Sequence, residues 1–279
     1  MKVFTSKHEL SGYLDTLKEK GKIIGFVPTM GALHQGHLSL IEIAARNTDC
    51  VVCSIFVNPT QFNDPEDLAK YPRPIDADIA MLEQVNCDVL FLPAVQEMYS
   101  GDEQWSIDLG YLERILEGRF RPGHYQGVTQ IVKKLFDVVQ PNKAFFGQKD
   151  FQQVKVIMKM VELYSMPVEI VMCPILREED GLAMSSRNIH LSPSERVEAL
   201  ALSKTLNSTR ENFAIKPISQ LQQDAESFLQ NSEGVELEYF EICNAETLMP
   251  AESKDEAGLV ALVAAKVGRT RLIDNIIIK

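Results

Sequence analysis

Two of the five histidines of this 279-residue chain lie three residues apart in the stretch PTMGALHQGHLSLIEIAARN, residues 28–47. An apolar run at Lys22–Val27 precedes His34 and His37, and a helical pattern at His37–Asn47 follows them. This order predicts a strand, a glycine-containing turn and a helix whose first backbone N–H groups point outward without a helical partner. Two imidazoles there are suited to donate hydrogen bonds to phosphate oxygens. The alternative is that one histidine caps the helix and the other lies on the surface.

A second candidate turn lies in the stretch FFGQKDFQQ. Lys149 follows Gly147 where a predicted strand gives way to a helix, so its ammonium group can meet a phosphate at the carboxyl edge of a sheet. Asp150 and Gln153 also have the spacing of a capping box. The two roles are compatible, because a capping aspartate can also contact a ribose hydroxyl.

Two further polar stretches could contact a substrate. Gln61 lies in SIFVNPTQFNDPED, which is predicted to end a strand and open a loop of roughly twenty residues. Its amide both donates and accepts, which suits a molecule with hydroxyls and a carboxylate. Ser185, Ser186 and Arg187, in GLAMSSRN, form a candidate clamp for a triphosphate. A polar interdomain linker is an equally good interpretation of that stretch.

The elements that must position these side chains alternate between short apolar runs and amphipathic stretches. The predicted strands are Lys22–Val27, Val51–Val57, Asp88–Leu92, Lys143–Phe146 and Val168–Met172. The predicted helices are Lys7–Lys20, His37–Asn47, Asp76–Val85, Gly127–Val139 and Phe151–Tyr164. This alternation predicts an α/β fold with a Rossmann-like, doubly wound parallel sheet. Ligands of such sheets bind beyond the carboxyl ends of the strands, where three of the stretches above begin.

The pattern changes after residue 176, so we predict two domains, 1–176 and 177–279. The turn-rich segment Arg177–Asn188 marks the boundary. Beyond it, Ser192 and Glu195 form a capping box with Pro193 at the first helical position, and a second helix is expected near Ile218–Gln230. Three short strand patterns end the chain, which predicts a smaller α+β C-terminal domain.

Composition limits the partners. The 28 basic and 39 acidic residues give a formal net charge of −11, which argues against a nucleic acid or an anionic membrane surface as the main partner. No apolar run reaches the roughly 18 residues of a membrane span, and the N-terminus lacks the apolar core of a signal peptide, so a cytoplasmic location is expected. Cys50 and Cys53 form a C-x-x-C within an apparent buried strand, where their side chains face opposite sides. We therefore expect buried thiols and no zinc site.

HQGH before a helix resembles the H-x-G-H signature of the nucleotidyltransferase superfamily. Five stretches narrow the match: VPTMGALHQGH, SIFVNPTQF, RPGHYQGV, FFGQKDFQQ and GLAMSSRN resemble, in order and separation, the pantoate–β-alanine ligase family. The terminal LVAAKVGRTRLIDN is also similar to the end of that family. The resemblance covers essentially the whole chain.

The resemblance implies a set of site residues. It implies that His34, His37 and Lys149 are catalytic, that Gln61 and Gln153 bind pantoate, and that Gln61 also binds β-alanine. The implied ATP-binding residues are Met30, Gly31, Ala32, Leu33, His34, Gln35, Gly36, His37, Gly147, Gln148, Lys149, Asp150, Leu176, Met184, Ser185, Ser186 and Arg187. Leu176 is implied to contact adenine through its backbone.

The implied reaction joins pantoate to β-alanine with ATP, through a pantoyl-adenylate, and releases AMP and pyrophosphate. The phosphate-binding side chains would align two anions and stabilise the charge that develops on phosphate oxygens. We find no convincing general base for the amine of β-alanine. Mg²⁺ is expected, and Asp78 is a candidate ligand for it, although Asp76 and Asp78 equally suit the first turn of a helix. A homodimer is implied by the family alone.

Two other functions remain open from the residues. A true nucleotidyltransferase would share the histidine pair but would be expected to present further basic residues for an acceptor phosphate. A non-catalytic nucleotide-sensing module would be expected to lack a histidine or the lysine, and all three are present. Arg121 and His124, in RPGHYQGV, either reach phosphate or order the loop before the next helix.

Overall fold

The computed structural model describes residues 1–101 and 103–279 of the chain. They form two compact units. The first comprises Met1–Gly147 and Gln152–Pro174, and the second comprises Gln148–Phe151 and Ile175–Lys279. Among the described residues, none of the helices has the length and apolar character needed to cross a membrane.

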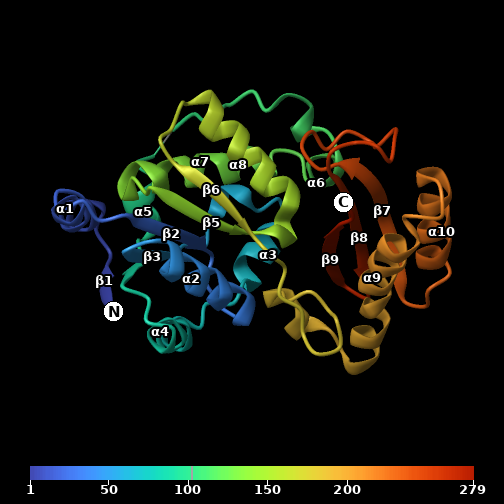
Figure 1. The fold of residues 1–279 in the computed structure, drawn as a ribbon. Coiled ribbons are helices and arrows are strands. Elements are labelled where there is room, and N and C mark those ends of the chain that lie inside the picture. The colour runs from blue at the N-terminus through green and yellow to red at the C-terminus, as the bar shows by residue number, and fades with distance from the viewer. Residues whose placement is uncertain (102) are drawn as a thin grey trace. The chain divides into compact units, whose positions relative to one another are not determined.

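The first unit is built on six parallel strands with helices on both faces (Figure 1). Its strands are β1 (Lys2–Phe4), β2 (Ile24–Thr29), β3 (Cys50–Ile55), β4 (Val89–Phe91), β5 (Lys143–Gly147) and β6 (Glu169–Cys173). Its α-helices are α1 (Lys7–Lys18), α2 (Gln35–Asn47), α3 (Pro65–Lys70), α4 (Ile75–Gln84), α5 (Val95–Met98), α6 (Leu116–Phe120) and α7 (His124–Val139). Helix α8 (Phe151–Leu163) precedes β6, and two 3-10 turns are η1 (Pro59–Gln61) and η2 (Gly110–Glu113).

Apolar side chains on both faces of the central strands explain why the sheet is buried. Every residue of β3 is buried. On β2, Val27 belongs to a core cluster with Leu40 and Ile41 of α2. The neighbouring Phe26 lies 6.2 Å, between ring centroids, from Phe136 of α7. Because successive side chains of a strand face opposite sides, α2 and α7 cover opposite faces of the sheet.

The strand order β1-β4-β3-β2-β5-β6 confirms the predicted Rossmann-like, doubly wound sheet. The chain builds outward from β2 in one direction, through β3 and β4, and then continues on the other side with β5 and β6. Strands β2 and β5 are direct parallel neighbours, with Gly25 opposite Lys143 and Phe26 opposite Ala144. They form the switch point, where the crevice at the carboxyl edge of such sheets binds ligands. The turn that carries His34 leaves β2 at this edge, and Gly147 ends β5 there.

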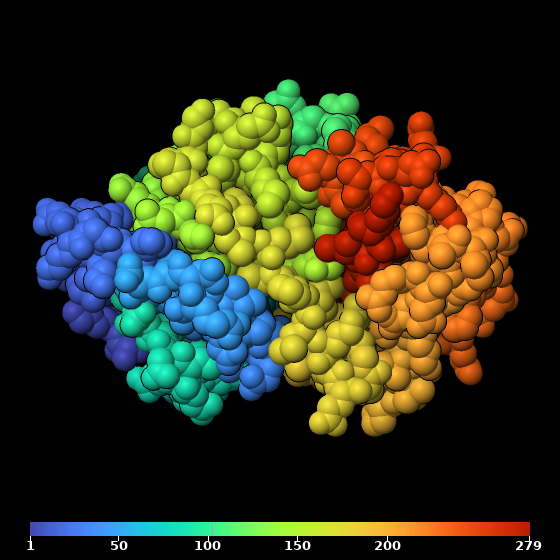
Figure 2. Space-filling model, in the orientation of Figure 1, coloured from blue at the N-terminus to red at the C-terminus, as the bar shows by residue number. Residues whose placement is uncertain are grey.

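The second unit is a three-stranded antiparallel sheet covered by two long helices, as the predicted α+β domain required (Figure 1). Its strands are β7 (Val235–Asn244), β8 (Leu259–Val267) and β9 (Thr270–Ile277). Its long helices are α9 (Pro193–Asn212) and α10 (Ile218–Gln230), and its 3-10 turns are η3 (Gln148–Asp150) and η4 (Ser186–His190). Leu202, Leu206, Leu221 and Leu229 of the helices pack on apolar residues of the sheet. In the space-filling view, atoms of α9 and α10 (orange) form an outer layer of this unit (Figure 2).

The capping box predicted before α9 is present. Ser192 Oγ accepts a hydrogen bond from Glu195 N at 3.3 Å, and Glu195 Oε2 accepts one from Ser192 N at 2.8 Å. The side-chain bonds satisfy two of the backbone donors that a helix start leaves without a helical partner.

Several features differ from the expectations, among them the short helices α5 and α6, which were not predicted. Strand β1 pairs with β4 at the sheet edge, but three residues are too few to give a periodic signal. Helix α7 begins at His124, three residues before the predicted start. The segment predicted as a twenty-residue loop contains η1 and α3, whose start is marked by Asp64 as N-cap and Pro65. The second unit also takes in Gln148–Phe151, which the predicted boundary at 176/177 assigns to the first domain.

Candidate active site

The turn after β2 leaves almost no room for a side chain at Gly31. Gly31 has φ +81°, and a Cβ at this residue would lie 2.9 Å from Ile55 Cγ2 and 3.0 Å from Asp78 Oδ2. Ala32, the next residue, also has a positive φ, of 50°. Two successive left-handed residues turn the chain sharply from the strand toward the helix. Glycine at residue 31 is therefore required by both conformation and space.

A buried carboxylate fixes this turn. Asp78, in the first turn of α4, is 1% exposed, and its two oxygens accept hydrogen bonds from Ala32 N at 2.9 Å and Leu33 N at 2.7 Å. Burial raises the pKa of Asp78, and the hydrogen bonds from Leu33 and Ala32 oppose this rise. The carboxylate thus serves the backbone of the histidine turn, a role that the sequence interpretation did not assign to it.

His34 and His37 form the start of α2. His34 is the N-cap residue, and its Nδ1 accepts a hydrogen bond from Gly36 N at 3.1 Å. His37 Nδ1 lies 3.4 Å from His34 N, as the returning half of a capping box, and the two ring centroids are 4.1 Å apart. With both Nδ1 atoms used as acceptors, each neutral ring carries its proton on Nε2. The capping alternative is therefore correct for His34, and both rings lie at a helix N-terminus.

Gln61 lies in η1, whose position depends on close packing against α7. A Cβ on Gly127 would lie 2.3 Å from Thr60 O, so glycine allows the helix to approach the turn. Asn58, 1% exposed, donates to Gln61 Oε1 at 3.1 Å and to Gly127 O at 3.0 Å. Gln61 Nε2 in turn lies 3.0 Å from Met30 Sδ. Two predicted site residues, Met30 and Gln61, are thereby in contact.

The sequence interpretation missed the role of Asn58 and left the role of His124 open. Asn58 orients the amide of Gln61, and the Asn-Pro that follows β3 was the available signal for a structured turn. His124 is 5% exposed, and its Nδ1 lies 2.9 Å from Gln61 O. Of the two alternatives for His124, this contact favours ordering of the loop.

The two consecutive glutamines of α8 have different environments. Gln152 is 2% exposed; its Nε2 donates to Leu112 O and Ile115 O, and its Oε1 accepts from Glu117 N. Gln152 is therefore a structural residue. Gln153 is half-buried, and its role in pantoate binding stays a prediction.

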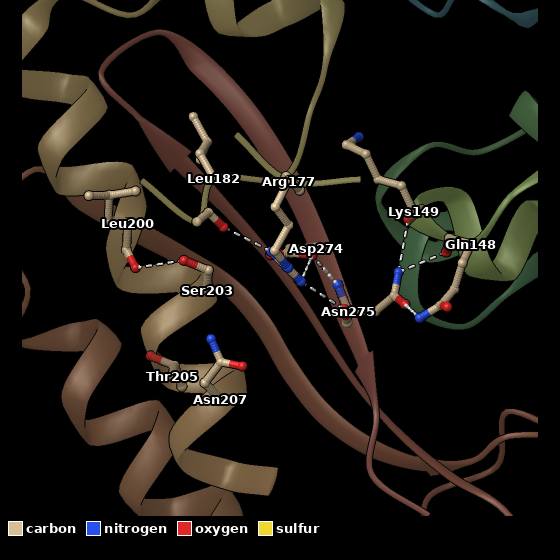
Figure 3. Close-up of polar contacts among 12 residues, drawn as sticks. Gln148, Lys149, Arg177, Leu182, Leu200, Ser203, Thr205, Asn207, Asp274 and Asn275 are labelled. Atoms are coloured by element: carbon tan, nitrogen blue, oxygen red, sulfur yellow. Dashed lines mark hydrogen bonds and ion pairs between the residues drawn. The ribbon is translucent and has the colours of Figure 1, made fainter. Parts of the chain in front are cut away.

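In the second unit, Gln148 and Lys149 form η3, directly after Gly147. Asn275 of β9 holds this turn: its Nδ2 donates to Gln148 O at 2.9 Å and to Lys149 O at 3.0 Å (Figure 3). The sequence interpretation used the stretch containing Asn275 only as part of the resemblance. Its signal was a pair of polar residues, Asp274 and Asn275, between apolar residues of the terminal strand.

The MSSRN stretch is an ordered turn of the second unit. Ser185 caps η4 by accepting a hydrogen bond from Arg187 N at 3.2 Å. Met184 N donates to Leu176 O at 3.1 Å, so two predicted ATP-binding residues are paired through their backbones. The first unit therefore carries residues 30–37, Gln61 and Gly147 of the predicted site, and the second carries Gln148, Lys149 and the 184–187 turn.

The doubly wound sheet and the histidine-capped helix at its switch point define an α/β protein of the class whose ligands bind at the carboxyl edge of the sheet. A family model described as pantoate-beta-alanine ligase matches residues 2–277. The chain belongs to the pantoate–β-alanine ligase family and is therefore a ligase.

Relatives named pantothenate synthetase or pantoate-beta-alanine ligase match along the whole chain. A pantothenate synthetase of Bacteroides thetaiotaomicron is 47% identical over 277 residues, covering 99% of this chain and 98% of the relative. The crystal structure of pantothenate synthetase from Thermus thermophilus superposes with a TM-score of 0.94 at 41% identity, covering 100% of this chain and 99% of that one. Pantoate-beta-alanine ligase from Francisella tularensis, complexed with "Beta-gamma ATP" and β-alanine, gives a TM-score of 0.77 at 33% identity, covering 99% and 97%.

Proposed function

We propose that this chain joins pantoate to β-alanine in two steps driven by ATP. In the first, a carboxylate oxygen of pantoate attacks the α-phosphorus of ATP, the bond from that phosphorus to the bridging oxygen breaks, and pyrophosphate leaves. In the second, the amine of β-alanine attacks the acyl carbon, the carbon–oxygen bond to AMP breaks, and the amine proton passes to solvent. The observation that carries this proposal is the histidine-capped helix at the switch point of the sheet, in a member of this family.

The histidines act as donors to phosphate oxygens in this proposal. Their Nδ1 atoms are engaged with backbone N–H groups, which orients each ring and keeps the proton on Nε2. The partial positive charge of the α2 N-terminus adds to the attraction. Lys149 supplies a full positive charge, and Ser185, Ser186 and Arg187 supply further donors. A donor of this kind is worth about 2–4 kcal/mol of transition-state stabilisation.

Gln61 and Gln153 bind pantoate in the same proposal, and Gln61 also contacts β-alanine. Asn58 fixes the Gln61 amide through its Oε1, which directs the Nε2 donor. An amide that both donates and accepts matches the hydroxyl and carboxylate groups of these substrates. For the second step we propose alignment of the amine with the acyl carbon, together with exclusion of water, as the chain's contribution.

Mg²⁺ enters the proposal with ATP, bound to its phosphate oxygens. Asp78, the candidate ligand, is 1% exposed, and both of its oxygens accept backbone N–H groups. Among the described residues, no three His, Cys, Asp or Glu side chains are grouped so as to hold a metal ion. These observations favour Mg²⁺ as part of the nucleotide substrate over a resident ion held by Asp78.

We further propose that the chain acts in the cytoplasm as a homodimer and that residues 177–279 form a lid domain. The net charge of −11 supports small-molecule substrates over nucleic acid. Sedimentation of the purified chain tests the dimer.

ATP–pyrophosphate exchange tests the proposed reaction. With Mg²⁺ and pantoate but no β-alanine, the chain should exchange labelled pyrophosphate into ATP. Lys149→Ala should lower this rate by about 100-fold or more, as loss of a charged donor in an active site does. The matched control is Lys159→Ala, which removes a lysine of α8 that pairs with Glu162 on the helix surface and should leave exchange unchanged. Folded chain that shows no exchange, and forms no AMP after β-alanine is added, would refute the ligase function and favour a nucleotidyltransferase.

A further inference from the structure

One side chain of the last strand holds the turn that carries Lys149. We propose that Asn275 is a positioning residue for Lys149, and that Asp274 and Arg177 hold Asn275 in place. The proposal rests on the function proposed for Lys149 at the phosphates of ATP.

Asn275 directs its whole hydrogen-bonding capacity at two consecutive residues. Its Nδ2 donates to Gln148 O at 2.9 Å and to Lys149 O at 3.0 Å, and its Oδ1 accepts from Gln148 Nε2 at 3.0 Å. The side chain is only 2% exposed, so water does not compete for these bonds. Fixing two successive carbonyls fixes the peptide planes on both sides of the Lys149 Cα. The direction in which the lysine side chain leaves the turn is therefore set by Asn275.

Only an amide of this length meets these requirements. Aspartate has nearly the same shape, but it has no donor for the two carbonyls and would bring a negative charge against them. Serine offers a single donor. A leucine or alanine has no side-chain donor for either carbonyl oxygen.

Lys149 contributes its backbone carbonyl, and not its side chain, to the hydrogen bonds with Asn275. In Figure 3 its side chain extends away from Asn275, and the contacts to Asn275 come from its backbone carbonyl. The hydrogen bonds that hold the turn therefore use the backbone of Lys149, while its ammonium group interacts electrostatically with Asp274. This division of backbone and side chain is expected of a residue that is positioned for a ligand.

The alternation of β9 explains how one strand serves two purposes. Leu272 and Ile276 lie in the core cluster with α9 and α10, and Asp274 shares their side of the strand by spacing. Asn275 faces the other side of the sheet, where η3 covers it. The same strand therefore joins the hydrophobic core to the turn with Lys149.

Asp274 and Arg177 anchor the strand at this point. Arg177 forms a two-pronged ion pair with Asp274, with Nη1 2.6 Å from Oδ2 and Nη2 3.0 Å from Oδ1. Arg177 also donates to Asn275 O at 3.3 Å and to Gly181 O at 3.1 Å, and Asp274 Oδ1 accepts from Asn275 N at 2.7 Å (Figure 3). Asp274 is 5% exposed, so the pair is largely shielded from water. The backbone of Asn275 is thus held from both its N–H and its C=O.

A double-mutant cycle with Lys149 tests the proposal. The full-length chain is compared with Asn275→Ala, Lys149→Ala and the double variant, by the kcat of pantothenate formation and by calorimetric titration with ATP. Asn275→Ala should lower kcat about 30-fold when Lys149 is present, because a misplaced functional group loses most of its effect. In the Lys149→Ala background the same change should lower kcat less than about 3-fold, since no ammonium remains to be positioned.

The matched control is Asn244→Ala. Asn244 lies on β7 of the same sheet and also makes three side-chain hydrogen bonds, to Glu256, Glu246 and Thr247. It should leave kcat unchanged in both backgrounds. Asn275→Ser, which keeps one donor, replaces Asn275→Ala if the latter does not fold.

The outcomes separate the proposal from the function on which it rests. An equal loss of kcat in both backgrounds, or an equal loss from Asn244→Ala, would overturn the positioning role. If the unaltered chain forms no pantothenate, the proposed function fails, and the cycle is then read from ATP affinity alone. Coupling of Asn275 and Lys149 in that affinity would retain the positioning role, whereas independent effects or no ATP binding would overturn it.

Discussion

Asp78 provides the sharpest test of how the histidine turn is held. Asp78→Asn keeps the shape of the side chain but replaces one acceptor oxygen by an NH₂ group. That group would face a backbone N–H of Ala32 or Leu33, where the carboxylate now accepts at 2.9 and 2.7 Å. One of the two backbone donors is then left buried without a partner.

The size of the effect follows from these contacts. Loss of a hydrogen bond to a charged group lowers stability by about 1.5–3 kcal/mol, and a buried donor without a partner costs about 1–3 kcal/mol. Removing the charge offsets part of this loss of stability, because burial disfavours the ionised form of Asp78 and so raises its pKa. We expect the free energy of unfolding to fall by about 2 kcal/mol, which corresponds to a drop in Tm of about 4–8 °C for a unit of this size.

Asp78→Asn should lower the catalytic efficiency more severely than it lowers the stability. Because Gly31, Ala32 and Leu33 lead directly into His34, a loosened turn moves both rings, which in the proposed function donate to the phosphates of ATP. We expect kcat/KM for ATP to fall about 10- to 100-fold at a temperature where the variant is fully folded. Denaturant unfolding and steady-state kinetics measure the two effects separately.

Asp76→Asn is the control, because Asp76 lies in the same first turn of α4 but is exposed. It should change the free energy of unfolding by less than about 0.5 kcal/mol and leave kcat/KM unaltered. Equal behaviour of Asp78→Asn and Asp76→Asn would refute the role of Asp78 as the support of the histidine turn.

Two further predictions concern packing. Gly127→Ala should destabilise the chain and raise KM for pantoate, because its Cβ would lie 2.3 Å from Thr60 O and displace η1. Gly12→Ala, in α1 with no atom within 4 Å, should instead stabilise the chain by about 0.5–1 kcal/mol. Chemical denaturation shows whether each variant lowers or raises the free energy of unfolding. Burial raises the pKa of the thiols of Cys50 and Cys173 to about 11 and of Cys87 and Cys243 to about 12. At pH 8 these thiols should therefore react with iodoacetamide about 100-fold more slowly in the native chain than in urea. Reaction at equal rates would contradict their burial.

Much of the fold could be predicted because its signals are local. Apolar runs such as the one that became β3 are buried on both faces, and the capping box at Ser192 depends on residues within one turn. The local structure around the histidine pair was predicted for the same reason, since a strand, a glycine turn and a helix start are adjacent in sequence. Strand β1 was missed because its three residues form a strand only by pairing with β4.

The supports of the candidate site could not be predicted, because they depend on contacts between distant residues. Asp78 has the ordinary sequence context of a first helical turn, and only the folded chain shows that its oxygens hold Ala32 and Leu33, about 45 residues away. Asn275 reaches Gln148 and Lys149 from the end of a different sheet. A single sequence reports such contacts by residue type alone, and aspartate and asparagine have many commoner roles.

The contact between Asn275 and η3 also bears on the order of folding. It joins residues 126 and 127 positions apart, and the entropy of closing so long a loop delays contacts of this kind. Strands β5 and β6, which flank the turn in sequence, pair with each other over a much shorter separation, with Lys143 opposite Glu169. This pair of strands can therefore form while the peptide planes around Lys149 are still free to rotate. During refolding, recovery of catalytic activity should consequently lag behind recovery of secondary structure until β9 contacts η3.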